Sequence, residues 1–446
     1  MLHRTYKTAK LLPQHLKIEM TPHKIQKHVI AKLPRQPLLT APATQAIVSA
    51  LTANGAQIRF VGGCVRDAVV NKKIKDIDFA TTDSPDIVVE LLKKANLKVL
   101  KTGIKHGTVI AVIDKTNFEI TTLRIDRLTD GRHATVEFTD SWGLDAARRD
   151  FTINALSATP NGDIFDYFNG LEDLQNGIVR FVGSANIRVQ EDYLRILRFF
   201  RFYSTYGHSK IDTESFEACQ KFAHKLASLS NERVRDELFQ ILSSKNPILA
   251  LKMMRSAGVL AVIFPEAKQL KNLEVIVQIE KIMLANRGVV PDPLRRFFSL
   301  ILGFELINVK RIAKKFVLSN NELRRLTAMH DAVMQLSTEE PQNCIKLSDE
   351  ENPIVTADKI IISWSSDLIG NVKPSDTMKK KWFAIFDAAI RENQLSFPVN
   401  GEDALRLGVP EGPKIGTVLK TVKSWWKMGG CEADRDACLH YLKKLL

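Results

Sequence analysis

The hydrophobic pattern of this chain changes near residue 185, and this change constrains the fold more than any other feature of the sequence. Before it, short apolar runs, glycine turns and amphipathic segments alternate, which is typical of a mixed sheet with flanking helices. After it, the apolar residues follow a helical period. The chain has 446 residues, too many for one hydrophobic core. The pattern therefore predicts an α+β head followed by an all-α remainder.

Individual elements are predicted from caps, turns and periodicity. The predicted strands are residues 57–61 and 75–81, followed by a hairpin that turns at residues 114–117. The predicted helices are one from residue 41 that stops near Gly55, residues 64–70, one that begins at Pro85 after the cap Ser84, and residues 191–203, 215–226, 231–242 and 247–257.

The balance of charge is strongly basic. Its 64 lysine and arginine residues against 50 acidic residues give a net charge of +14, which favours nucleic acid as a partner ahead of a membrane surface. Half of this excess lies in residues 1–36, which hold eight basic residues and one acid. We expect residues 1–40 to be a disordered extension or an overlong gene start, with an RNA-contacting arm or a transit peptide as the alternatives.

The sequence gives no indication of a membrane or a secretory pathway. No apolar run is long enough to span a bilayer, and no hydrophobic signal core is visible. The five cysteines are scattered and lack the CxxC spacing of a metal site. We therefore expect a cytoplasmic protein with reduced thiols and no obligate protein partner.

A glycine pair, an arginine and two aspartates stand close together in the head. Gly62 and Gly63 lie between a predicted strand and a predicted helix, where bare N–H groups and Arg66 can approach phosphate oxygens. On a strand, Asp76 and Asp78 would face the same side, and such a pair repels unless a cation such as Mg²⁺ lies between the carboxylates. The alternative is two surface aspartates at a strand end. Together the motifs point to a nucleoside triphosphate, although no Walker loop or GxGxxG occurs.

These residues form the first of five ordered motifs. Together the five resemble the class II tRNA nucleotidyltransferases (CCA-adding enzymes) and the related bacterial poly(A) polymerases of the polymerase-beta nucleotidyltransferase superfamily. Together the motifs extend over about 180 residues, which makes them far more specific than any one alone. They are GGCVRD with DID (62–78), RRDFTINAL (148–156), FDYFNGLEDLQNG (165–177), EDYLRILRFFRF (191–202) and LSNERVRDELFQIL (229–242).

The resemblance implies transfer of a nucleotide from CTP or ATP to a tRNA 3′-hydroxyl, with Mg²⁺ as cofactor and release of pyrophosphate. Asp76 and Asp78 would hold the Mg²⁺, and Glu119 is either a third catalytic carboxylate or a hairpin-edge residue. The motif at 148–150 is implied to contact the ribose, with either arginine facing the nucleotide. The residues implied to bind the nucleotide are Gly62, Gly63, Arg66, Arg148, Arg149, Asp150, Asp192, Arg195, Arg198 and Arg201.

A pair of residues in the fourth motif suggests how a protein selects C and A. Asp192 and Arg195 are three apart in a predicted helix and would be neighbours on its surface. Aspartate accepts and arginine donates, which complements the amino donor and ring-nitrogen acceptor shared by cytosine and adenine but not guanine or uracil. Arg198 and Arg201 continue the spacing and would form a basic flank. The alternative is a salt bridge on a solvated helix.

With the resemblance, the chain is predicted to divide into five parts. They are the basic extension (1–40), a nucleotidyltransferase head (41–165), a neck with the base-reading helix (166–260), a helical body (261–345) and a helical, RNA-binding tail (346–446).

CCA addition to tRNA is the preferred function. The alternatives are a poly(A) polymerase that uses ATP alone and a non-catalytic RNA-binding protein with the same fold. Residues 124–139 match the loop with which CCA-adding enzymes switch from C to A, and residues 401–426 resemble their C-terminal segment. Both features favour CCA addition over poly(A) synthesis.

Overall fold

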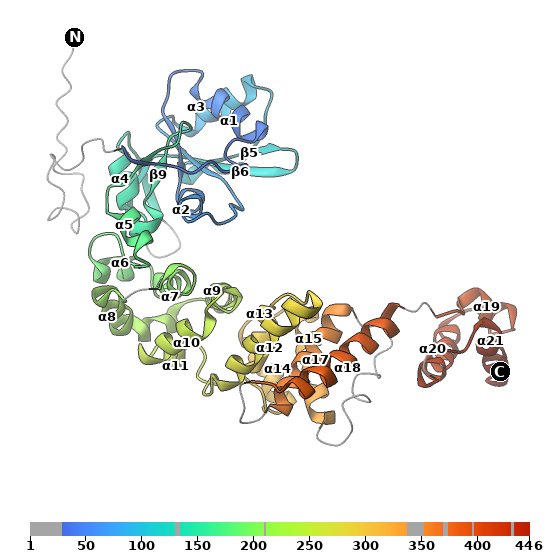
Figure 1. The fold of residues 1–446 in the computed structure, drawn as a ribbon. Coiled ribbons are helices and arrows are strands. Elements are labelled where there is room, and N and C mark those ends of the chain that lie inside the picture. The colour runs from blue at the N-terminus through green and yellow to red at the C-terminus, as the bar shows by residue number, and fades with distance from the viewer. Residues whose placement is uncertain are drawn as a thin grey trace, which may run out of the picture. The chain divides into compact units, whose positions relative to one another are not determined.

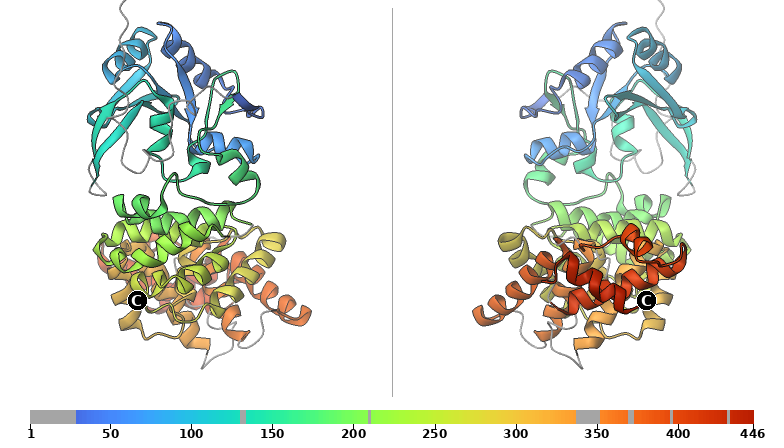
Figure 2. Two further views of the ribbon diagram at one scale, coloured as in Figure 1. Left: turned by 90° about the vertical axis from the view of Figure 1, so that its left-hand side faces the viewer. Right: turned by 90° about the vertical axis from the view of Figure 1, so that its right-hand side faces the viewer.

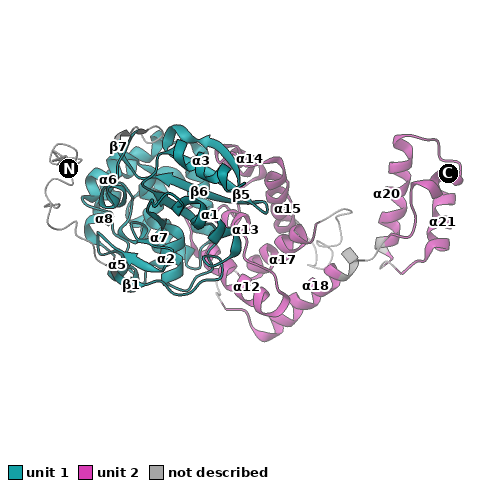
Figure 3. Cartoon of the chain, turned by 90° about the horizontal axis from the view of Figure 1, so that it is seen from above, with its two compact units in different colours: residues 1–265 teal, residues 266–446 magenta. Residues whose placement is uncertain are grey.

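The computed structural model describes residues 29–129, 134–208, 211–336, 352–368, 373–394, 397–429 and 432–446. The chain forms two compact units, Met1–Pro265 and Glu266–Leu446 (Figure 3). Every described strand lies before residue 166, and the described elements after residue 185 are helices (Figure 2). The predicted mixed head with a helical remainder is therefore confirmed. No described helix is both long enough and apolar enough to cross a membrane.

An eight-stranded sheet is the framework of the first unit (Figure 1). Its strands lie in the order β1-β10-β9-β2-β3-β6-β5-β4, and only β3 and β6 run parallel. Because β2 and β3 are antiparallel neighbours, the end of β2 and the start of β3 meet at one edge. The strands are β1 (Val29–Lys32), β2 (Ile58–Val61), β3 (Asp78–Thr81), β4 (Lys98–Gly103), β5 (Thr108–Ile113), β6 (Thr116–Thr122), β9 (Ser157–Ala158) and β10 (Asp163–Phe165).

Two of the hairpins in the head bear on the sequence analysis. The predicted β5–β6 hairpin is confirmed, and its turn residues Asp114 and Lys115 both have positive φ, 48° and 63°, as a two-residue type I′ turn requires. The second hairpin, β7 (Arg124–Thr129) with β8 (Ala134–Phe138), forms a separate two-stranded sheet. It occupies most of the predicted loop at 124–139, of which residues 130–133 lie outside the described residues.

The faces of the large sheet differ in character. Phe79 on β3 packs against Phe60 on β2 with ring centroids 5.1 Å apart. Since side chains alternate along a strand, Asp78 projects from the opposite face. Helices α1 (Pro42–Thr52) and α3 (Pro85–Lys94) pack against the sheet, as predicted from Pro85 and the apolar periodicity (Figure 1).

The predicted strand over residues 75–81 is too long. β3 comprises only Asp78–Thr81, and Asp76 lies in the irregular segment before it. The neighbouring strands β2 and β6 pair only within these four residues, so nothing extends the strand backwards. A shared strand therefore does not align Asp76 with Asp78.

The prediction that residues 1–40 are disordered does not hold for residues 29–32. These residues form β1, which pairs with β10, and Lys32 Nζ lies 2.6 Å from Asp163 Oδ1. The pairing satisfies backbone groups that a free arm would leave to water. Residues 1–28 lie outside the described residues, as does the predicted boundary between body and tail at 345–346.

The single helix predicted over residues 191–203 is wrong. The chain forms α6 (Ala185–Glu191) and α7 (Leu194–Tyr206), separated by Asp192 in an extended conformation with φ −156° and ψ 109°. Asp192 Oδ1 accepts a hydrogen bond from the Leu194 N–H at 3.0 Å, which satisfies a donor at the start of α7.

The other helices of the first unit include those predicted at 64–70, 231–242 and 247–257. The helix predicted at 215–226 ends at Phe222, because Ala223–Ser228 form a 3₁₀ turn, and the short helices at 142–147 and 170–175 were not predicted. The other helices are α2 (Gly63–Val69), α4 (Trp142–Ala147), α5 (Gly170–Gln175), α8 (Thr213–Phe222), α9 (Asn231–Ser243), α10 (Pro247–Ser256) and α11 (Val259–Ile263), with the short 3₁₀ turn η5 (Thr152–Asn154) among the functional elements.

The second unit contains a buried cluster of charges. Arg295 lies 2.8 Å from Glu280 and 3.0 Å from Asp358, and both carboxylates are fully buried. Arg296 pairs with Glu280 at 2.6 Å, and Arg325 pairs with Asp358 at 2.7 Å. The cluster thus links α12, α13, α15 and α17. The helices of this unit are α12 (Lys271–Arg287), α13 (Pro293–Ser299), α14 (Leu306–Lys315), α15 (Asn320–Leu336), α17 (Pro353–Asp367), α18 (Asp376–Gln394), α19 (Gly401–Arg406), α20 (Pro413–Met428) and α21 (Arg435–Lys444).

Candidate active site

The glycine pair forms the turn between β2 and α2. Gly62 is buried and has φ +68°, a conformation that favours glycine. A Cβ added at Gly62 would stand 3.0 Å from Arg149 Nη1, and one at Gly63 would stand 3.6 Å from Arg66 Nη2. The turn therefore places bare backbone beside two guanidinium groups, an arrangement that suits an anion.

Arg66 is held in place on several sides. Its Nη1 donates to Asn154 Oδ1 at 2.5 Å, and its Nε donates to Asp67 Oδ1 at 3.1 Å. The guanidinium carbon lies 4.4 Å from the ring centre of Tyr206, whose hydroxyl donates to Asp67 at 2.5 Å. These contacts connect α2 to η5 and α7, so the arginine is fixed before any ligand arrives.

Three carboxylates gather at the start of β3. Asp78 is the first residue of β3 and is the register partner of Glu119 on β6. Burial raises the pKa of Asp78, the charges of Glu119 and Asp76 raise it further, and Arg149 opposes them, which leaves it at about 6. The negative charge of this group is therefore only partly compensated, and a cation would stabilise it.

A magnesium ion fits these residues. Among the described residues, no group of three or more His, Cys, Asp or Glu side chains is arranged to hold a metal ion. Mg²⁺ does not need one, because it commonly takes one or two carboxylates and fills its other positions with water and substrate phosphates. Asp78 is half-buried, whereas Asp76 and Glu119 are exposed and accessible to a substrate.

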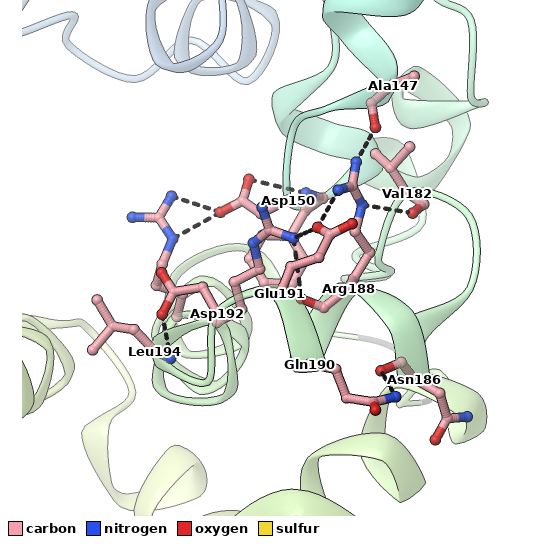
Figure 4. A network of polar contacts seen from close by, with 12 residues as sticks. Ala147, Asp150, Val182, Asn186, Arg188, Gln190, Glu191, Asp192 and Leu194 are labelled. Atoms are coloured by element: carbon pink, nitrogen blue, oxygen red, sulfur yellow. Dashed lines mark hydrogen bonds and ion pairs between the residues drawn. The ribbon is translucent and has the colours of Figure 1, made fainter. Parts of the chain in front are cut away.

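Asp150 joins the head to α7. Its Oδ1 accepts from Asn154 Nδ2 at 2.9 Å, and its Oδ2 accepts from Arg198 Nε at 2.7 Å (Figure 4). Burial by itself would raise the pKa of Asp150, but Arg198 and Asn154 outweigh it and lower the pKa to about 2. A continuous hydrogen-bonded chain thus runs from Arg66 through Asn154 and Asp150 to Arg198.

Glu191 orients two arginines at the junction of α6 and α7. Its Oε2 accepts from Arg188 Nη1 and from Arg195 Nη1, each at 2.5 Å (Figure 4). Arg188 is buried and also donates to the carbonyl oxygens of Val182 and Ala147. Arg195 donates further to the Arg188 carbonyl oxygen at 3.0 Å. Arg195 is therefore held by the end of α6.

The sequence pattern predicted that Asp192 and Arg195 are neighbours on one helix surface, but the structure does not place them so. The helix break between them gives each its own partner. Asp192 Oδ2 accepts from Arg233 Nη2 on α9 at 2.8 Å, while Arg195 contacts Glu191. Both side chains remain half-buried, so each keeps some exposed surface.

The predicted basic flank of Arg198 and Arg201 is paired with carboxylates. Arg201 Nε lies 2.7 Å from Glu237 Oε2, and Arg198 Nη1 lies 3.8 Å from Glu237 Oε1. Burial raises the pKa of Glu237, although the two arginines counteract it. The positive charge of this part of α7 is thus reduced by Glu237 and Asp150.

Arg148 and Arg149 take different directions from one buried carboxylate. Asp145 accepts from Arg148 Nε at 2.8 Å and from Arg149 Nη2 at 3.2 Å. Arg149 lies beside Gly62 and acts on the charge of Asp78. Arg148 interacts instead with Asp126 on β7.

Several residues of this site have no role in the sequence analysis. They all hold another side chain in place, and they are Asp145, Asn154, Arg188, Arg233 and Glu237. Asn154 is the one with a visible signal, because it is an amide side chain inside the mostly apolar run FTINAL. A buried polar residue in such a run normally has a hydrogen-bonding partner.

Models of known protein families match both the part of the chain with the glycine turn and the part with α9. The model described as "Poly A polymerase head domain" matches residues 58–180. The model described as "Probable RNA and SrmB- binding site of polymerase A" matches residues 210–271. The two matches include the side chains of this candidate site, except Tyr206 and those from Arg188 to Arg201, which lie between the two matches.

Individual relatives extend over most of the chain. It is 35% identical over 395 residues to the mitochondrial CCA tRNA nucleotidyltransferase 1 of Mus musculus, with 87% of each chain covered. It is 28% identical over 395 residues to the CCA-adding enzyme of Ligilactobacillus salivarius, covering 88% of this chain and 93% of the relative. A crystal structure of the Bacillus stearothermophilus CCA-adding enzyme in complex with CTP matches with 25% identity and a TM-score of 0.69, over 91% of this chain and 98% of that one. The chain therefore belongs to the family of CCA tRNA nucleotidyltransferases.

Proposed function

We propose that this enzyme adds C, C and A to the 3′ end of tRNA, using CTP and ATP and releasing pyrophosphate. The relatives that carry this activity in their names support the proposal. The observation that carries it is the hydrogen-bonded chain Arg66–Asn154–Asp150–Arg198. This chain connects a glycine turn suited to phosphate with α7, the helix that carries Arg195 in its first turn, so one nucleotide would contact both.

The triphosphate would lie over the glycine turn. We assign its contacts to the backbone at Gly62 and Gly63 and to Arg66 and Arg149. Arg149 is preferred over Arg148 because it lies beside Gly62, whereas Arg148 interacts electrostatically with Asp126. Fixed donors of this kind favour phosphoryl transfer because they need little reorganisation when charge moves.

Mg²⁺ is the proposed cofactor, with Asp76 and Asp78 as its protein ligands and Glu119 as a further carboxylate at the site. When bound, Mg²⁺ would neutralise charge on the triphosphate and orient its oxygens. The raised pKa of Asp78 supports this assignment. In the reaction, the RNA 3′-oxygen forms a bond to the α-phosphorus as the bond to the bridging oxygen of pyrophosphate breaks. The residues at the glycine turn hold the leaving group.

Asp192 and Arg195 are the proposed readers of the base. Asp192 lies at the break before α7 and Arg195 in its first turn, where Arg233 and Glu191 orient them. Aspartate would accept from the exocyclic amino group of cytosine or adenine, and arginine would donate to the adjacent ring nitrogen. Asp150 is proposed to contact the ribose, and Arg198 and Arg201 flank the nucleotide.

The wider organisation remains a proposal as well. We propose that residues 41–165 carry the chemistry, that residues 166–260 read the base, and that residues 261–345 and 346–446 form the body and the tRNA-binding tail. A cytoplasmic location is proposed from the sequence, although the relatives from Mus musculus, Homo sapiens and Danio rerio are named as mitochondrial enzymes.

Poly(A) synthesis is the second candidate, because both matching family models carry the name of poly(A) polymerase. A test supplies a tRNA that lacks its CCA end with Mg²⁺ and each NTP, alone and combined, and sequences the products. Addition of CCA followed by a halt is the expected result. A long A tail from ATP alone would identify a poly(A) polymerase instead.

A further inference from the structure

A buried carboxylate outside the proposed list of active-site residues contacts both the nucleotide site and a neighbouring hairpin. Asp145 lies on the short helix α4, and its side chain is 4% exposed. Its Oδ2 accepts from Arg149 Nη2 at 3.2 Å, and Arg149 Nη1 lies next to the glycine turn at Gly62. The same guanidinium therefore has one nitrogen on Asp145 and another at the proposed phosphate site.

The other oxygen of Asp145 faces the first strand of the β7–β8 hairpin. Oδ1 accepts from Arg148 Nε at 2.8 Å and from the backbone N–H of Arg124 at 3.4 Å. Arg124 is the first residue of β7. The chain leaving β8 returns beside this point, where the Thr139 N–H donates to the Leu123 carbonyl oxygen at 2.9 Å. The carboxylate therefore holds the base of the hairpin.

Electrostatics agrees with this double contact. Burial alone would raise the pKa of Asp145, but Arg148 and Arg149 outweigh it, so the pKa is lowered and the group stays ionised. Both oxygens of Asp145 already accept hydrogen bonds from protein donors. Without its charge, the two arginines would lose the carboxylate that they share, and Arg149, with 18% of its side chain exposed, could turn away from Gly62.

We propose that Asp145 is a positioning residue, which sets Arg149 over the glycine turn and at the same time fixes the β7–β8 hairpin to the nucleotide site. The inference rests on the proposed function only for the identity of the nucleotide that Arg149 meets. It predicts that one substitution of Asp145 removes only the contact with Arg149, whereas another also removes the contact with the Arg124 N–H.

Asp145→Asn separates them because asparagine has one oxygen and one NH₂ group. The oxygen can still accept from the Arg124 N–H and Arg148, whereas the NH₂ group cannot accept from Arg149. Asp145→Ala removes both contacts. Asp140→Asn is the matched control, since Asp140 is an exposed aspartate just before α4 with no partner among the described contacts.

The experiment measures three quantities for the full-length wild type and the three variants. These are KM and kcat for CTP and ATP on tRNA, CTP affinity by equilibrium dialysis without RNA, and hydrogen exchange of the Arg124 amide. For Asp145→Asn we expect KM for both nucleotides and the dissociation constant of CTP to rise about tenfold, the order that one charge-assisted hydrogen bond supports, with exchange unchanged. For Asp145→Ala we expect the same rise together with faster exchange at Arg124.

Two results would overturn the proposal. One is nucleotide affinity at the wild-type value in Asp145→Asn and Asp145→Ala. The other is an equal loss of affinity and of exchange protection in both variants, which would indicate only a general loosening of the head. If the wild type adds no CCA, the proposed function fails, but the dialysis and exchange measurements still decide the role of Asp145.

Discussion

Arg198 contacts a single oxygen of Asp150 through two nitrogens, Nε at 2.7 Å and Nη2 at 2.6 Å. The other oxygen of Asp150 accepts from Asn154, so the carboxylate has well-placed donors on both sides. Asp150 comes directly after Arg149, and Arg198 lies on α7, 48 residues away. This contact therefore fixes the distance between the proposed phosphate site and the proposed base-reading residues.

The Asp150–Arg198 pair predicts a dependence of stability on pH. Because the pKa of Asp150 is lowered to about 2 in the folded protein, the pair stabilises the fold fully above the unfolded pKa, and this contribution disappears as pH falls towards 2. We expect Asp150→Asn to lower the free energy of unfolding by about 2 kcal/mol at pH 7, and by progressively less below about pH 4. Denaturant titrations of both proteins from pH 7 to 3 measure this, with Asp140→Asn as control. A difference that stays constant down to pH 3 would contradict the assignment.

Asn154 is predicted to couple two parts of the site. Its side-chain amide accepts from Arg66 and donates to Asp150, so Asn154→Ala leaves a donor and an acceptor without their partner. We expect kcat/KM for both nucleotides to fall by about 10- to 100-fold, since each lost contact involves a charged group. Steady-state kinetics on tRNA measure the loss, and Asn176→Ala, an exposed asparagine at the end of α5, is the control. Wild-type kinetics in Asn154→Ala would remove the coupling role.

Asp78 is predicted to be essential for transfer and dispensable for RNA binding. Asp78→Ala removes the half-buried carboxylate beside Glu119, and we expect activity to fall by at least about 10³-fold, as loss of a metal-binding carboxylate would cause. Asp76→Ala should behave in the same way. Single-turnover addition measures the first effect and tRNA binding by filter retention measures the second. Asp86→Ala, an exposed change at the start of α3, serves as control. Substantial residual activity would exclude the metal assignment.

Asp192 is predicted to govern base selection. Asp192→Ala removes the proposed acceptor for the amino group and also leaves Arg233 without its carboxylate. We expect discrimination of CTP over UTP to fall from about 10⁴ towards about 10, with a smaller change in affinity for the triphosphate. Competition among the four NTPs measures selection, and Glu232→Ala, exposed on α9, is the control. Unchanged selection among the four nucleotides would rule out this role.

Local chemistry made part of the fold predictable. The β5–β6 hairpin depends on its two turn residues, and α3 depends on Pro85 at its first position, so short stretches of sequence suffice. The break between α6 and α7 is different, because apolar residues continue at a helical spacing on both sides of it. Asp192 is extended there, and its side chain accepts a hydrogen bond at the start of α7. A period in the sequence does not reveal such a cap.

The partners of several site residues could not be predicted from the sequence, because they are far apart along the chain. Arg66 and Asn154 are 88 residues apart, and Asp192 and Arg233 are 41 residues apart, so only the folded chain brings each pair together. The predicted basic flank on α7 illustrates the same limit, because Glu237 on α9 neutralises part of it. Motifs identify residue types, whereas their partners depend on packing.

The buried charges of the second unit limit how this part of the chain can evolve. Glu280 and Asp358 have no exposed surface, and each relies on arginines from neighbouring helices. Replacing one member alone strands an opposite charge in the interior, whereas exchange of a whole group for apolar residues of similar volume can be neutral. Lineages are therefore expected to keep this set intact or to lose it together, and single substitutions there should first be noticed as poor expression at high temperature.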